Sequence, residues 1–253
     1  MTARGGGIVG PVVAVALLVL VAAMVVSWGV GQVRLDATPA PTPLHTAHDG
    51  DGYLLWALRD DGSPVRWDPC TPLRWTTRPS DPPWLRTLAA DAAATLAANT
   101  GLAVQYVERG DDAVGPARAL TDDDGSWGPV LVTLTTPGES EWLAESERGL
   151  ALPVTVDGQF VTGQVLLQAH IDLGPDMASR DGSWGATLMH EWGHIVGLDH
   201  VEDPAQLMHA EPLPGPAAWG SGDLRGLRAL GADATCLPAP PAREGQLATP
   251  GRR

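Results

Sequence analysis

Lysine is missing from this sequence: all 16 basic residues are arginine, against 30 acidic residues and a formal net charge of −14. The arginines form no basic cluster. Nucleic acids and anionic lipid surfaces attract proteins through concentrated positive charge, so we expect neither as a partner of the folded part. The lack of lysine, together with abundant alanine, glycine and proline, indicates a GC-rich bacterial genome.

Cysteine is almost as scarce, since only Cys70 and Cys236 occur, one near each end of the part that follows the apolar N-terminus. In an exported domain, such a pair predicts one disulfide that ties the two ends together. Two free buried thiols are the alternative. The disulfide interpretation places the domain in an oxidising compartment.

Charge is also absent from one long stretch, because no charged residue stands between Gly5 and Gly31. Residues 8–30 are mostly Val, Ala and Leu, and they exceed the roughly 20 residues that span a bilayer core. We therefore expect a single-pass transmembrane anchor at 8–30, a cytoplasmic tail at 1–7 and a domain on the extracytoplasmic side of the cell membrane. Secretion after cleavage of a signal peptide is the alternative.

Composition divides the rest of the chain into a linker, one domain and a tail. Residues 31–64 are rich in proline and are expected to form an extended extracytoplasmic linker, in which residues 53–58 suggest a short strand or docking segment. Residues 65–237 have the size of one domain, and residues 238–253 are expected to be a disordered tail. We expect the domain to be a monomer.

The pattern of the domain is that of an α+β fold with a small mixed sheet. Asp81 is predicted to cap a long helix that starts with two prolines and runs through alanines to Asn99. Asp181, Gly182 and Ser183 supply start signals for a second helix, and residues 221–230 are predicted to form a third. The sequence also predicts strands at 73–78, 103–108, 130–135, 152–156 and 164–171, with a turn at 157–158 and a short helix at 139–148.

The segment HEWGHIVGLDH, which begins at His190, carries the strongest functional signal. His190 and His194 are four residues apart, so on a helix their rings share a face and can bind one cation together. Gly197 can adopt positive φ and reverse the chain, which brings His200 in as a third ligand. Three neutral imidazoles with an open fourth position are how catalytic Zn²⁺ is held. Glu191 stands beside that position.

Two other stretches are candidates for a second cation. Residues 122–124 are three consecutive aspartates, but they lack the ligand spacing of an EF-hand, so we expect a solvated acidic turn with Ca²⁺ as the alternative. His170, Asp172 and Asp176 form the other candidate. A structural role is expected for that histidine.

Together these residues resemble the zinc site of a metzincin metallopeptidase, in particular of the matrixin branch. The histidine motif matches at each fixed position, and Leu207 and Met208 follow His200 at the matrixin interval. The predicted order of elements is also similar, with an active-site helix, a Met-turn and a final helix. The resemblance implies that Met208 forms an apolar floor under the zinc ligands. No inhibitory propeptide motif is visible, and Ala210 stands where the astacin branch has a tyrosine.

The expected function is therefore that of a zinc-dependent endopeptidase that acts outside the membrane on a peptide or protein substrate. Glu191 would be the general base toward the attacking water. The strand at 164–170 is expected to hold the substrate by strand addition. Two alternatives stay open: a membrane-tethered zinc-binding or adhesion module that has lost catalysis, and a metal-dependent hydrolase of cell-wall amide bonds.

Overall fold

Five strands form the main sheet: β3 (Leu73–Thr76), β4 (Val104–Tyr106), β5 (Val130–Thr135), β6 (Gly149–Val156) and β7 (Gln159–Gln168). Their order is β4-β3-β5-β7-β6, with parallel pairing throughout except that β6 is antiparallel to β7. This computed structural model describes residues 46–47, 52–109, 113–231 and 234–242. The mixed sheet and the predicted α+β class are confirmed.

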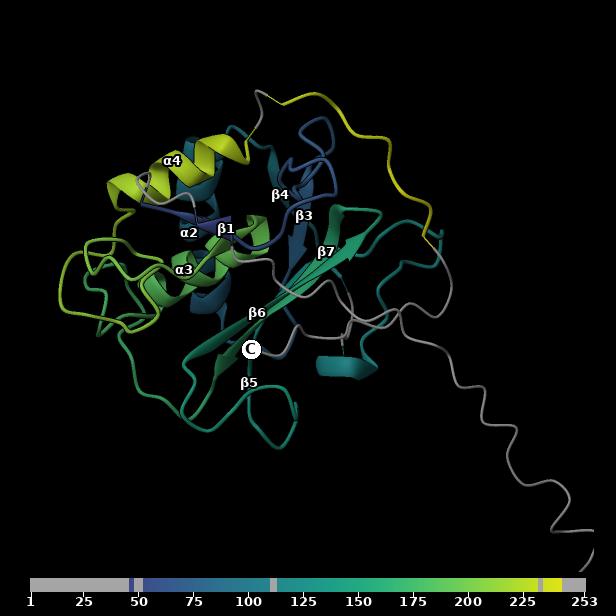
Figure 1. Cartoon of the computed structure of the whole chain (residues 1–253). Helices are drawn as coiled ribbons and strands as arrows, with labels where there is room; N and C mark the ends of the chain where they lie inside the picture. Colours follow the sequence, from purple (N-terminus) through teal and green to yellow (C-terminus); the bar gives the residue numbers. More distant parts are fainter. Residues whose placement is uncertain (1–45, 48–51, 110–112, 232–233, 243–253) are drawn as a thin grey trace, which may run out of the picture. The chain divides into compact units, whose positions relative to one another are not determined.

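Three α-helices pack together beside this sheet (Figure 1): α2 (Pro83–Thr100), α3 (Trp184–Val196) and α4 (Ser221–Ala229). A short 3₁₀ turn, η2 (Gly115–Ala117), precedes β5. α2 contacts α3 and α4, and α3 contacts β6 and β7. The main apolar core joins side chains of the helices to those of the sheet, so α3 is buried between α2 and the β6–β7 pair.

The β6–β7 hairpin turns at Asp157 and Gly158, as predicted. Both residues have positive φ, 50° and 73°, which suits a tight two-residue hairpin turn. Both strands are longer than the sequence predicts. Every residue of β7 is buried, so its sequence lacks the alternation of apolar and polar residues that marks a half-exposed strand.

Asp81 does not cap α2, contrary to the prediction. The residue before the helix is Pro82, which offers no side-chain cap. The Asp81 carboxylate instead accepts hydrogen bonds from the Thr133 hydroxyl at 2.9 Å and the Leu134 amide at 3.2 Å. Burial raises the pKa of this carboxyl, although the hydrogen bonds act to lower it. Asp81 thus ties the start of α2 to β5.

The prediction of a helix at residues 139–148 is wrong, because this segment is a series of turns. Leu143 is buried and packs with Leu152 of β6 in a second apolar cluster. Glu139 accepts a hydrogen bond from the Thr135 hydroxyl at 3.1 Å. These tertiary contacts to the sheet outweigh the local preference for a helix.

A second sheet joins the N-terminal segment to the region of the histidine motif. Its strands β1 (Thr46–Ala47), β2 (Leu54–Leu55) and β8 (Leu198–Asp199) run antiparallel in the order β1-β2-β8. Leu55 and Ala57 are buried in the main core. The short strand predicted within residues 53–58 is confirmed. The folded domain therefore begins before residue 65 and includes part of the linker predicted at 31–64, because this apolar segment has a place in the core.

The predicted membrane anchor and the predicted tail lie at the two ends of the chain. The tail at 1–7 and the transmembrane helix at 8–30 lie outside the described residues. Within the described ranges, none of the helices has the length and apolar character needed to cross a bilayer. Near the other end, the Trp127 indole donates to the buried Pro240 carbonyl at 2.9 Å. The first residues of the predicted disordered tail, 238–253, therefore pack against the domain.

Cys70 and Cys236 form the predicted disulfide, with their Cα atoms 5.5 Å apart. The Asp68 carboxylate accepts hydrogen bonds from the Cys70 amide at 3.1 Å and the Leu237 amide at 3.0 Å. The bridge and this carboxylate together hold the C-terminal segment against the loop before β3. They close a loop with a sequence separation of 166 residues.

Replacing both cysteines, Cys70→Ser with Cys236→Ser, should lower the free energy of unfolding by about 2–5 kcal/mol, because the unfolded chain regains the freedom of a long loop. Urea unfolding followed by tryptophan fluorescence measures the difference. Wild-type protein in a reducing agent should unfold like the double variant. An unchanged unfolding midpoint in both samples would contradict a stabilising disulfide.

Candidate metal centre

The helix α3 begins at the last of the three predicted start signals and ends at Gly197, as predicted. Ser183 is its N-cap, and its side chain accepts a hydrogen bond from the Ala186 amide. Gly197 ends the helix with a φ of 114°, in the left-handed region. A Cβ atom at this position would also lie 2.9 Å from the Phe160 ring, so the reversal requires glycine for both conformation and space. The reversed chain leads through β8 to the third histidine of the motif.

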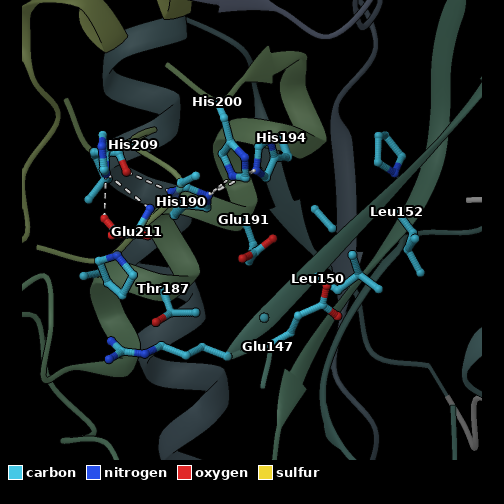
Figure 2. Close-up of a pocket in the computed structure, with 18 of the residues that line it drawn as sticks. Glu147, Leu150, Leu152, Thr187, His190, Glu191, His194, His200, His209 and Glu211 are labelled. Carbon is cyan, nitrogen blue, oxygen red and sulfur yellow. Dashed lines mark hydrogen bonds between the residues drawn. The ribbon is translucent and has the colours of Figure 1, made fainter. Parts of the chain in front are cut away.

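The three histidines converge through their Nε2 atoms (Figure 2). Nε2 of His190 lies 2.9 Å from Nε2 of His200 and 3.1 Å from Nε2 of His194, and the remaining distance is 3.1 Å. Tetrahedral coordination at a metal–nitrogen distance of about 2.0–2.1 Å sets such atoms roughly 3.3 Å apart. The observed triangle is only slightly smaller, so the three rings can bind one metal ion.

The other ring nitrogen, Nδ1, fixes the tautomer of two of these histidines. Nδ1 of His190 lies 2.8 Å from the Leu207 carbonyl, and Nδ1 of His194 lies 2.9 Å from the Leu198 carbonyl. A carbonyl oxygen only accepts, so each Nδ1 donates and each neutral ring presents an Nε2 lone pair. Two lone pairs that face each other at 3.1 Å repel, and a shared cation removes that repulsion. The donor set therefore fits a metal ion.

Glu191 lies beside the histidines, and its carboxylate occupies the space between them and β6 (Figure 2). The residue is 6% exposed. Gly149 of β6 leaves the room that this carboxylate needs, because a Cβ atom there would lie 2.8 Å from Oε1 of Glu191 and 3.0 Å from its Cγ. Gly149 does not have positive φ, so it is needed for space and not for conformation.

Met208 packs against α3 from the segment that follows His200, the last histidine of the motif. It is buried, and its sulfur would lie 2.5 Å from a Cβ atom placed on Gly193. The Met208 carbonyl accepts a hydrogen bond from the Val201 amide at 3.1 Å, which ties this segment to the chain just after His200. The role of an apolar floor under the zinc ligands, which the resemblance implies for Met208, stays a prediction.

Asp223 of α4, which sequence reasoning missed, holds the segment that contains Met208. This buried carboxylate accepts hydrogen bonds from the amides of Leu207 at 2.6 Å, Gly220 at 2.8 Å and Met208 at 3.4 Å. Burial raises the pKa of the Asp223 carboxyl, and the three hydrogen bonds act to lower it. Because the Leu207 carbonyl orients His190, Asp223 supports a metal ligand through one intermediate residue. An acidic residue in the first turn of a helix normally indicates only a favourable helix terminus.

A cavity of about 640 Å³ includes the three histidines in its lining and extends along β6. β6 is the outermost strand of the sheet, so within the described residues one edge of its backbone has no strand beside it. The prediction that the strand at 164–170 lies at the rim of the cleft is wrong. Residues 164–168 belong to β7, which pairs with β5 on one side and β6 on the other. A central strand has no free edge, whereas β6 has one.

Neither candidate for a second cation gathers its ligands. Asp122 pairs with Arg74 at 3.0 Å and with Arg109 at 3.4 Å, so this carboxylate of the acidic turn already has cationic partners. In the part of the chain that the structure describes, clusters of the size of a metal site are limited to the three histidines and to Asp68 with the two bonded cysteines. His170, Asp172 and Asp176 are not among them.

Two comparisons with known proteins were negative. No protein-family model matches this chain, and a search of curated proteins found no match. The residues and geometry of the chain itself therefore carry the functional conclusion.

The substitution Asp223→Ala should weaken metal binding by about 10–100-fold, because the Leu207 carbonyl then loses the support that orients His190. Asp223→Asn should bind metal nearly as well as wild type, since one oxygen can still accept the two shorter hydrogen bonds. Competition with a chelating dye measures the affinity. The control is Asp91→Ala, on the exposed face of α2. Equal affinities for Asp223→Ala and this control would show that Asp223 does not support the centre.

Proposed function

We propose that this protein is a zinc-dependent endopeptidase that hydrolyses peptide bonds in an extended substrate. The observation that supports this proposal is the convergence of three imidazole Nε2 atoms beside the Glu191 carboxylate, in the lining of a cavity. A structural metal site normally has four protein ligands, whereas a catalytic zinc site has three and leaves one position open. The all-histidine donor set suits Zn²⁺.

His190, His194 and His200 would hold the ion. When bound, zinc polarises the scissile carbonyl and lowers the pKa of a water molecule toward about 7. Glu191 takes a proton from the water that attacks the carbonyl carbon. It then passes this proton to the amine that leaves as the C–N bond breaks. The close fit of Glu191 against Gly149 restricts the carboxylate to a position beside the metal.

The free edge of β6 supports a substrate that binds as an added strand. Gly149, Leu150, Ala151 and Leu152 all line the cavity, so the cavity follows the backbone of this strand. Ala151 packs in the main core, whereas Leu152 packs in the second cluster on the opposite face of the sheet. An added peptide would therefore place alternate side chains on the metal side and on the outer side of β6.

The resemblance to the matrixin branch of the metzincins supports the same proposal. It consists of the complete histidine motif, Met208 packed against α3, and a final helix that supports the Met208 segment. One departure concerns regulation: Cys70 is bonded to Cys236, so it has no free thiol with which to block the metal. We propose that the domain works as a monomer outside the cell membrane and is tethered to it by residues 8–30. An oxidising compartment of this kind is one in which a disulfide persists.

The substitution Glu191→Ala should retain one zinc ion per chain but lower kcat at least about 100-fold, because the general base is lost. His194→Ala should lose both the metal and the activity. Cleavage of quenched fluorescent peptides and elemental analysis of the same samples separate the two effects. Glu108→Ala, an exposed residue outside the cavity, is the control. Wild-type turnover in the Glu191 variant would contradict the mechanism.

The substitution Gly149→Ala should lower kcat by about 10–100-fold, because the added Cβ atom displaces the Glu191 carboxylate and misplaces the general base. The zinc content should not change, since the three heavy atoms nearest to the added Cβ all belong to Glu191 and not to a histidine. Gly138→Ala is a matched control, because a Cβ atom there lies 3.7 Å from its nearest neighbour. Similar kcat values for the two variants would rule out the proposed fit between Gly149 and Glu191.

A further inference from the structure

Trp56 reaches the metal centre from the N-terminal segment, far from the histidine motif in sequence. Leu55 pairs with Leu198 in the small sheet, and the Trp56 amide donates to the Gly197 carbonyl at 2.8 Å. These backbone contacts fix Trp56 beside the C-terminal end of α3. The indole is half-buried and lines the cavity.

The Trp56 indole packs directly on one of the metal-binding rings. Its centroid lies 5.5 Å from that of the His194 ring, at an interplanar angle of 67°. An edge-to-face contact of this kind uses the edge of one ring and leaves further surface of the indole available. That surface borders the cavity beside the metal.

β6 runs from the Glu191 carboxylate toward the C-terminal end of α3, beside which Trp56 lies. Gly149, at its start, lies against Glu191, as described above. Pro153, four residues later, pairs with Gly163, and a Cβ atom on Gly163 would lie 3.0 Å from Ile195 at the C-terminal end of α3. A peptide added along β6 would therefore cross the metal and reach the end of the cleft that holds Trp56.

Most charged residues of the cavity lining come from segments outside β6 and outside the N-terminal segment that holds Trp56. Glu141, Glu147 and Arg148 precede β6, Arg180 precedes α3, and Glu211 follows Met208. Figure 2 shows Glu211 beside His209, on the opposite side of His190 from His194. The Trp56 indole, together with Pro153 and Thr155 of β6, contributes uncharged lining to the same cavity. The half-buried indole surface is suited to a large apolar side chain of the substrate, which gains most from contact with it.

We propose that Trp56 is a specificity-determining residue, which binds a large apolar side chain of the substrate on the His194 side of the scissile bond. This inference rests on the proposed peptidase function. The contact is made equally in the ground state and the transition state, so its loss should raise KM for such substrates and leave kcat nearly unchanged.

The test uses the full chain and peptide libraries that vary each of the three positions on either side of the cleaved bond. Wild type should prefer Phe, Leu or Trp over Ala at one position. Trp56→Ala should lower kcat/KM for those peptides about tenfold, through KM, while peptides with Ala there change less than about twofold. Trp56→Phe should lie between the two. Trp84→Ala, a half-buried tryptophan of α2 outside the cavity, should keep the wild-type preference.

Two results would overturn the role of Trp56: an unchanged preference in Trp56→Ala, or an equal loss for all peptides through kcat or zinc content. The second result would mean that Trp56 only supports His194. A wild-type protein that binds zinc but cleaves none of the peptides would instead reject the proposed peptidase function, and the specificity role with it.

Discussion

The lone pairs of three imidazole nitrogens that point at one another repel, unless a cation binds between them. Much of this domain holds the three rings in that arrangement. The Leu207 and Leu198 carbonyls accept from Nδ1 of His190 and His194, which orients both rings and directs their Nε2 lone pairs inward. Because both carbonyls belong to the chain after α3, the course of that chain determines the geometry of the centre. A helix with two histidines is therefore only half of the site.

Two other parts of the sequence hold the segment after α3 in position. α4 supplies the Asp223 carboxylate, which binds the amides of Leu207 and Met208 from within the core. The N-terminal segment supplies β2, which pairs with β8 and so supports the Leu198 carbonyl. Both supports are non-local, so the metal centre should form late in folding, after the helices and the small sheet have docked.

The sequence was most informative where one local pattern determines the structure. The two histidines at helical spacing, the glycine that ends α3 and the Asp157-Gly158 turn all act through nearby backbone, and each lies where it was predicted. The errors concern residues whose partners are far away. Asp81 resembles a helix cap but binds β5, and the edge strand could not be told from the central one because both are apolar. Asp223 and Trp56 gave no local signal of their contacts with the site.

X-ray absorption spectroscopy at the zinc edge, on protein purified without added metal, tests the centre most directly. We expect about one zinc ion per chain, with a first shell of three imidazole nitrogens and one oxygen at about 2.0–2.1 Å. Outer-shell scattering should require three intact histidine rings. A metal content far below one ion per chain, a shell that contains sulfur, or a fit with fewer than three imidazoles would contradict the account.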